Sequence, residues 1–96
     1  MDYTGKQKAK LRRLANEKPI MFQIGMAGLT DNIINQINEN LLKHEVGRVT
    51  VLKTCPDDIN DIIIKLGQNG IYVVYKIGRV LLMYKSNPNL KDRIVL

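Results

Sequence analysis

Residues 20–41 read IMFQIGMAGLTDNIINQINENL, and this stretch decides the fold. The apolar run over 20–24 is typical of a buried strand, and Pro19 disfavours helix in the residue before it. Two glycines three positions apart, Gly25 and Gly28, then interrupt the run. Thr30 is well placed as the N-cap of a helix whose apolar positions recur at helical spacing, namely Ile33, Ile34, Ile37 and Leu41. The stretch therefore predicts a strand, a glycine turn and an amphipathic helix in succession.

Helices and strands are also predicted on both sides of this unit. Thr4 followed by Gln7 fits a capping box, so a first helix is expected over about 5–16. The helix after Thr30 should end near residue 44 or 45, and alternation over 49–52 predicts a second strand. Pro56 suits the first position of a third helix, with the carboxylates of Asp57 and Asp58 at the positive end of its dipole.

The last third of the chain has the pattern of a hairpin. Residues 71–77 and 80–84 are rich in β-branched and aromatic side chains, and Gly78 with Arg79 suits a two-residue type II′ turn. From Ser86 the chain is a polar turn with a short apolar end, which is either an edge strand or a packed tail.

The resulting order, α-β-α-β-α-β-β, predicts an α/β fold, a two-layer α+β sandwich with a four-stranded mixed sheet. The chain has 96 residues, of which 45% are hydrophobic and 25% charged, values that suit one globular domain over 1–96.

No reaction chemistry is visible in the sequence. Cys55 is the single cysteine and His44 the single histidine, so no disulfide, metal cluster or catalytic set is expected, and no cofactor. The apolar runs are far shorter than a membrane span needs, and the basic start lacks the apolar region of a secretory signal. We therefore expect a non-enzymatic protein with no membrane segment, in the cytoplasm.

Charge is unevenly distributed along the chain. The net charge is +4 over residues 1–28, −3 over 29–61 and +5 over 62–96. If the two basic ends meet in the fold, they form a positive surface that attracts polyanions. A merely solvated, solubilising face fits the same numbers.

The glycine turn over 25–28 admits two interpretations. Glycines allow close approach of a ligand to the backbone, and the N–H groups of the following helix start attract phosphate. A tight turn without a ligand explains the same pattern, and the turn lacks the longer glycine and lysine motif of nucleotide-hydrolysing loops.

Taken in order, several motifs resemble one family. They are the Lys6-Gln7-Lys8 start with Leu11, Leu14 and Ala15, the loop from Gly25 to Thr30, and the Ile77-Gly78-Arg79 hairpin leading to Leu82 and the Tyr84-Lys85 pair. The chain resembles the CRM domain (chloroplast RNA splicing and ribosome maturation), in particular its small stand-alone bacterial YhbY-type members. The resemblance implies a fold like the C-terminal domain of a translation initiation factor, with sheet order 1-2-4-3 and the fourth strand antiparallel to the others. It also implies RNA binding, with the glycine loop against the sugar-phosphate backbone as in KH domains.

The leading hypothesis is an RNA-binding protein, a monomer that binds ribosomal RNA of the large-subunit precursor as an assembly factor. Its predicted RNA-binding residues are Lys6, Lys8, Lys10, Arg12, Arg13, Gly25, Met26, Ala27, Gly28, Thr30, Arg79 and Lys85. Five aromatic residues and no tryptophan make a broad base-stacking platform unexpected, and Phe22 is expected in the core. Two alternatives are a protein-interaction module whose basic face docks an acidic protein, and a small phosphate-substrate enzyme.

Overall fold

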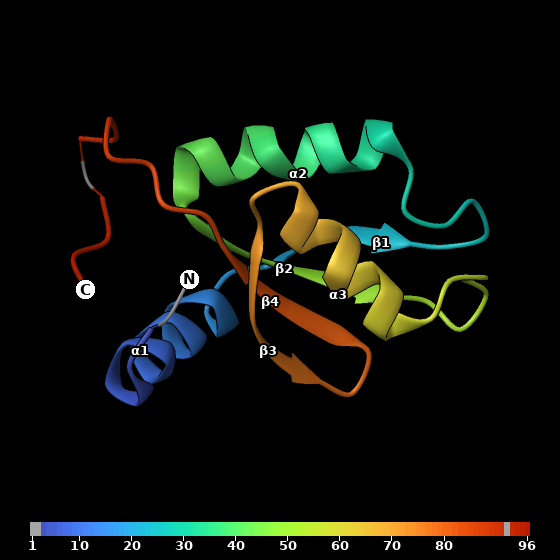
Figure 1. Cartoon of the computed structure of the whole chain (residues 1–96), viewed down its shortest axis with the longest axis horizontal. Coiled ribbons are helices and arrows are strands. Elements are labelled where there is room, and N and C mark those ends of the chain that lie inside the picture. The colour runs from blue at the N-terminus through green and yellow to red at the C-terminus, as the bar shows by residue number, and fades with distance from the viewer. Residues whose placement is uncertain (1–2, 92) are drawn as a thin grey trace.

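The computed structural model describes residues 3–91 and 93–96. Its helices and strands follow the predicted order (Figure 1): α1 (Gly5–Asn16), β1 (Ile20–Ile24), α2 (Asp31–His44), β2 (Val46–Val51), α3 (Ile59–Gln68), β3 (Tyr72–Ile77) and β4 (Val80–Tyr84). The capping box of α1 is present, since Thr4 and Gln7 exchange hydrogen bonds of 3.0 and 3.1 Å between side chain and backbone. In this part of the chain no helix is long and apolar enough to span a bilayer.

The four strands form one mixed sheet in the order β1-β2-β4-β3. β1 pairs parallel with β2, and β4 pairs antiparallel with both β2 and β3. This confirms the strand order and the reversed fourth strand that the family resemblance implied. At the β3–β4 turn Gly78 has a φ of 58° and Arg79 is not in the positive-φ region, as a type II′ turn requires.

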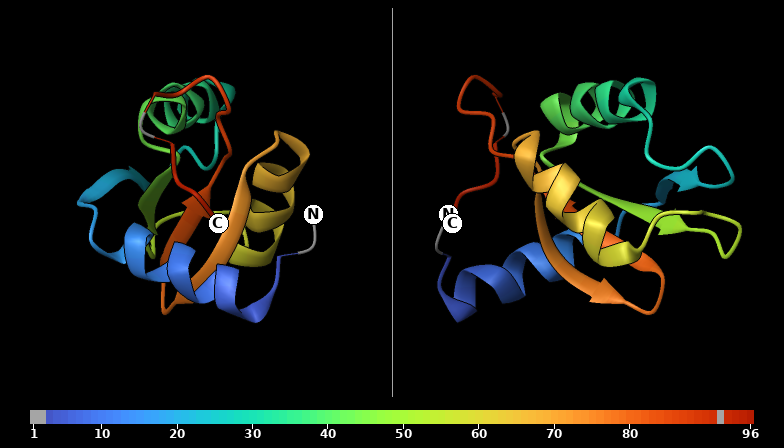
Figure 2. Two further views of the ribbon diagram at one scale, coloured as in Figure 1. Left: turned by 90° about the vertical axis from the view of Figure 1, so that its left-hand side faces the viewer. Right: turned by 45° about the vertical axis from the view of Figure 1, so that its right-hand side comes forward.

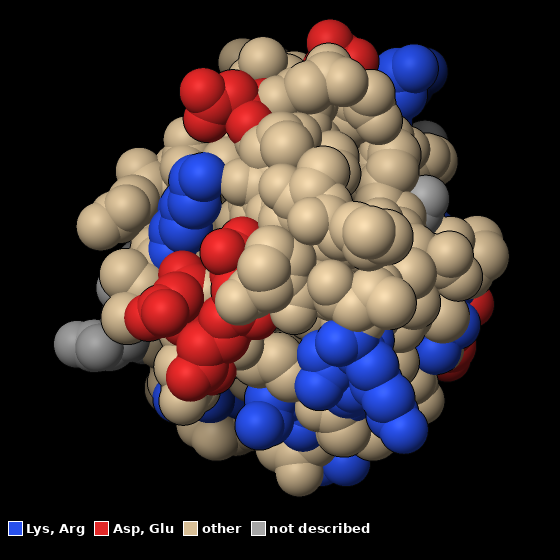
Figure 3. All heavy atoms as spheres, turned by 90° about the vertical axis from the view of Figure 1, so that its right-hand side faces the viewer, with Lys and Arg blue, Asp and Glu red and all other residues tan. Residues whose placement is uncertain are grey.

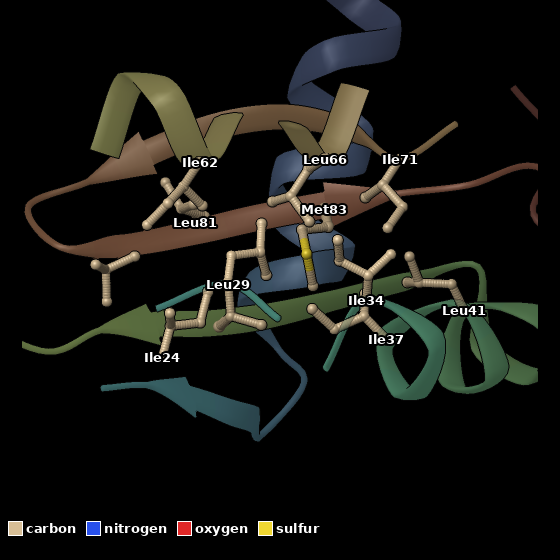
Figure 4. Close-up of a cluster of buried hydrophobic side chains, with 12 residues drawn as sticks. Ile24, Leu29, Ile34, Ile37, Leu41, Ile62, Leu66, Ile71, Leu81 and Met83 are labelled. Carbon is tan, nitrogen blue, oxygen red and sulfur yellow. The ribbon is translucent and has the colours of Figure 1, made fainter. Parts of the chain in front are cut away.

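Helices cover both faces of the sheet (Figures 1 and 2). The larger core lies between the sheet and the pair α2 and α3 (Figure 4), and its buried members are Ile24, Leu29, Ile34, Ile37, Leu41, Val49, Val51, Ile62, Leu66, Ile71, Leu81 and Met83. The smaller core lies under α1 and consists of Leu11, Ala15, Val46, Leu82 and Tyr84. The predicted two-layer sandwich thus describes the α2 and α3 side, and α1 adds a partial third layer on the opposite face.

Two predicted boundaries were wrong. β2 begins at Val46 rather than residue 49, because Val46 and Gly47 pair with Tyr84 and Met83 and both are buried. α3 begins at Ile59 rather than at Pro56, because Asp58 is the N-cap and accepts a 3.0 Å hydrogen bond from the backbone N–H of Asn60.

The residues after β4 form a packed tail, held by Glu45. Glu45 ends α2 with a left-handed backbone (φ 61°) and is completely buried. Its carboxylate accepts hydrogen bonds from the backbone N–H groups of Asn87 (3.0 Å) and Ile94 (2.6 Å). Ile94 also packs against the smaller core, so the tail covers the end of the sheet and adds no described strand.

The aromatic side chains divide between core and surface. Phe22 packs against the larger core, as predicted. Tyr3 lies against Tyr72 and Tyr84, with ring centroids 5.0 and 5.7 Å apart, and burial raises the pKa of its hydroxyl. Tyr75 differs from the others because 44% of its surface is exposed.

Candidate nucleic-acid interface

The glycine loop forms a tight turn between β1 and the start of α2. The backbone N–H of Gly28 donates a 2.9 Å hydrogen bond to the carbonyl of Gly25, and Gly28 has a φ of 72°. The turn leaves Met26 80% exposed and Ala27 exposed at its tip. Thr30 caps α2 by accepting a 3.2 Å hydrogen bond from the N–H of Ile33, as its position predicted.

Two side chains from the α3 region hold this loop in place. The Asp57 carboxylate accepts a 3.1 Å hydrogen bond from the N–H of Leu29, and the Lys65 ammonium donates a 2.8 Å hydrogen bond to the carbonyl of the same residue. A Cβ on Gly28 would lie 2.5 Å from Asp57 Oδ2, which is closer than real contacts allow. The glycine is therefore required by the fold itself, and a carboxylate already uses one backbone donor that a phosphate would otherwise find.

The basic residues of α1 lie on two sides of the helix. Arg12 stacks on Tyr75, with its guanidinium carbon 3.8 Å from the ring centroid. Four residues on, Asn16 accepts a 3.5 Å hydrogen bond from Arg48 of β2, and Lys8, four residues before Arg12, shares this side of the helix. Lys8, Arg12 and Asn16 are all exposed and thus form a row beside the sheet, on the flank of the buried Leu11 and Ala15.

The other three basic residues of α1 face the C-terminal tail. Lys6, Lys10 and Arg13 line a groove together with Leu96, and the Lys10 ammonium donates a hydrogen bond to the carbonyl of Val95. Lys6 and Arg13 remain exposed, whereas Lys10 is partly buried by this contact. The structure therefore separates the predicted basic cluster into a row beside the sheet and a row beside the tail.

Arg79 and Lys85 lie at opposite ends of β4. The Arg79 guanidinium donates to the carbonyls of Val51 (2.6 Å) and Leu52 (2.9 Å), which fastens the β3–β4 turn to the end of β2. Lys85 donates a 2.8 Å hydrogen bond to the side-chain oxygen of Asn38 on α2. A strand of this length separates the two residues by about 20 Å, so they do not share a site.

Arg79 belongs to the same end of the molecule as the glycine loop. Leu52, whose carbonyl Arg79 contacts, donates its own N–H to the carbonyl of Ile24 just before the loop, at 2.9 Å. Figure 3 views this end of the molecule and shows Asp and Glu side chains gathered on one flank. Lys and Arg side chains gather in the lower half of that view, at the height of α1 and the β3–β4 hairpin in Figure 1. The two basic ends of the chain meet where α1 packs on β3 and β4, toward the other end of the sheet in Figure 1.

Four residues near these groups were not among the RNA-binding residues predicted from the sequence. Arg48 and Tyr75 contact the row of α1 beside the sheet, and Asp57 and Lys65 brace the glycine loop. The alternation of β2 would have revealed Arg48 if the strand had been started at Val46. The contacts of the other three join residues about 30 or more positions apart, and no local pattern indicates them.

Nothing in the described residues suggests a metal site, since no group of three or more His, Cys, Asp or Glu side chains occurs among them. Cys55 is half-buried and packs against the larger core.

Comparison with known proteins supports the resemblance inferred from the motifs. A curated protein of Bacillus subtilis (strain 168), "Probable RNA-binding protein YqeI", is 38% identical over 90 residues, covering 93% of this chain and 94% of the relative. The solved structure described as "Solution structure of the hypothetical protein SAV1595 from Staphylococcus aureus, a putative RNA binding protein" is 32% identical with a TM-score of 0.78, and the match covers 99% of this chain and all of that one. The family described as the CRS1/YhbY (CRM) domain matches residues 4–85. The chain therefore belongs to the CRS1/YhbY (CRM) domain family.

Proposed function

We propose that this protein binds RNA and has no enzymatic activity. The observation that carries the proposal is the row of α1 beside the sheet, where Arg12 lies on the exposed ring of Tyr75 and Asn16 binds Arg48 of β2. Cations neutralise phosphates, and an aromatic ring offers a surface for bases. The names of the B. subtilis and S. aureus relatives point to the same ligand class.

We further propose that the RNA is ribosomal RNA of the large-subunit precursor and that the protein is a cytoplasmic, monomeric assembly factor. The support for this is the resemblance to stand-alone YhbY-type proteins over nearly the whole chain. The glycine loop would lie against the sugar-phosphate backbone through the exposed tip residues Met26 and Ala27, because Gly28 is buried against Asp57. The basic row beside the tail, with Lys6 and Arg13, would add phosphate contacts.

Sedimentation of a cell lysate tests this proposal. The protein should move with particles of the large-subunit precursor in a sucrose gradient, and nuclease treatment should return it to the top. An acidic protein partner docked on the same basic face would leave the association intact after nuclease treatment. Sedimentation only at the top of the gradient, with or without nuclease, would contradict the ribosomal assignment.

A further inference from the structure

Part of the sheet face that carries α1 has no helix over it. In Figures 1 and 2, α1 lies across one end of the sheet, and the strands extend beyond it toward the β3–β4 turn. The helix buries Val46, Leu82 and Tyr84, whereas Tyr75, Ile77 and Gln23 on this side remain exposed. We refer to the uncovered part as the open face.

Strand pairing identifies the residues of the open face. Leu82 lies under α1, and its partners across the sheet are Arg48 on β2 and Tyr75 on β3. Directly paired residues point to the same side of a sheet. Two positions further along, a second row crosses all four strands on the same side and consists of Gln23, Thr50, Val80 and Ile77.

The open face combines an apolar surface with unsatisfied polar groups. Tyr75 and Ile77 are 44% and 42% exposed. Arg48 makes one hydrogen bond of 3.5 Å among the described residues, from Nη1 to Asn16, and its Nε, like Thr50 Oγ1, is buried without a partner there. The terminal N–H groups of Arg48 that Asn16 does not use remain for a ligand, and Gln23 presents an exposed amide.

The charge around the open face suits a polyanion. On the side of the open face next to α1 lie three basic residues, Lys8 and Arg12 of α1 and Arg48 of β2. The acidic residues Asp57, Asp58 and Asp61 lie at the start of α3, on the other side of the sheet. Gln23 precedes the glycine loop by two residues, so the second row ends beside the proposed phosphate-binding loop. The basic side chains next to α1 therefore lie on one side of the exposed Tyr75, and the glycine loop lies on the other side.

We propose that the open face binds unpaired bases of single-stranded RNA. Tyr75 stacks on one base, with Arg12 held on its ring, and Arg48 and Gln23 contact the next nucleotide toward the glycine loop. Duplex RNA fits poorly, because its bases are stacked inside the helix and only flipped or unpaired bases reach an aromatic ring. This inference rests on the proposed RNA binding and assigns that function to one surface and one form of RNA.

Binding of a defined oligonucleotide tests the assignment. The probe is an oligouridylate of about 12 nucleotides with one central 2-aminopurine, a length within the range that small single-strand-binding domains cover. Affinity is measured by fluorescence anisotropy, stacking by quenching of the 2-aminopurine, and folding of each variant by thermal denaturation. A duplex of the same length serves as the comparison ligand.

Matched variants separate stacking from charge. Tyr75→Leu keeps an apolar side chain on the strand and should weaken single-strand binding about fivefold or more, with loss of quenching, whereas Tyr75→Phe should bind within about twofold of the parent. Arg12→Gln should weaken binding more than Arg13→Gln, since both remove one charge from α1 but only Arg12 lies on the ring. Ile64→Ala changes an exposed apolar residue of α3, on the opposite side of the sheet, and should bind like the parent.

Other outcomes would overturn the inference in distinguishable ways. If Tyr75→Leu binds like the parent while Arg12→Gln and Arg13→Gln weaken binding equally, charge alone binds the RNA and only the open-face assignment fails. If the folded parent binds neither single strand nor duplex, the proposed function fails with it. If Tyr75→Leu instead abolishes a concentration-dependent dimer in analytical ultracentrifugation and leaves RNA affinity unchanged, a second copy of the chain covers the face.

Discussion

Replacing Gly28 by alanine should destabilise the fold through two separable effects. Gly28 has a φ of 72°, and an L-residue in this left-handed region costs about 1–2 kcal/mol. The new Cβ would also lie 2.5 Å from Asp57 Oδ2 and would push the carboxylate off the Leu29 N–H. Loss of that charged hydrogen bond adds about 1–3 kcal/mol.

The expected total is near 3 kcal/mol, which in a domain of this size lowers the melting temperature by about 12–24 °C. Asp57→Ala removes the clashing group, so Gly28→Ala made in that background should cost only the conformational part, about 1–2 kcal/mol. Gly25→Ala is the control within the same loop, since its φ is not positive and its Cβ would meet Leu52 Cδ1 at an ordinary 3.5 Å. Its effect should stay within about 0.5 kcal/mol.

Urea denaturation of the four variants and the parent measures these free energies of unfolding. An equal cost of Gly28→Ala with and without Asp57 would show that the carboxylate does not brace the loop in solution. A cost below about 1 kcal/mol in the parent background would refute the backbone part of the reasoning as well.

Three further predictions concern RNA affinity and the tail. Ala27→Asp at the exposed loop tip should lower RNA affinity more than tenfold with no change in melting temperature, by anisotropy and calorimetry; unchanged affinity would remove the loop from the interface. With about three to six phosphates contacted, the logarithm of the binding constant should fall against the logarithm of salt concentration with a slope of roughly −2 to −4, and a flat response would exclude phosphate contacts as the source of affinity. Glu45→Ala leaves the N–H groups of Asn87 and Ile94 without their buried acceptor and should cost about 2–4 kcal/mol, with faster proteolysis of the tail; an equally protected tail would contradict this anchoring.

The helices and strands could be predicted because each carries its own local signal. Thr4 with Gln7 starts α1, Thr30 caps α2, and Gly78 turns the hairpin, and all three features are present in the structure. The predicted start of α3 was wrong because Pro56, Asp57 and Asp58 each suit the first residues of a helix. The hydrogen bond from the N–H of Asn60 makes Asp58 the N-cap, so the helix begins at Ile59.

The proposed interface could not be assembled from local patterns, because pairing across the sheet creates it. Arg48 and Tyr75 share a side only through Leu82, their common partner in the middle of the sheet. The sequence also suggested one pair that the structure separates. Lys85 is close to Arg79 in sequence, but the length of β4 lies between the two residues and Asn38 binds the Lys85 ammonium.

An irregularity in β3 determines which side Tyr75 faces. Val73 pairs with Met83 and Tyr75 pairs with Leu82, so Val74 is an extra residue in the ladder. In a regular strand Val73 and Tyr75 would point to the same side, and Tyr75 would lie over the larger core with Val73. The extra residue lets Val74 pack against the smaller core while Tyr75 also turns to the α1 side, where Arg12 meets its ring. Deleting Val74 would make Tyr75 follow Val73 directly and keep its pairing with Leu82, so regular alternation should leave Tyr75 on the α1 side. If the shortened chain folds, its RNA affinity should therefore fall less than in Tyr75→Leu, and an equal loss would show that the side Tyr75 faces is not what RNA binding requires.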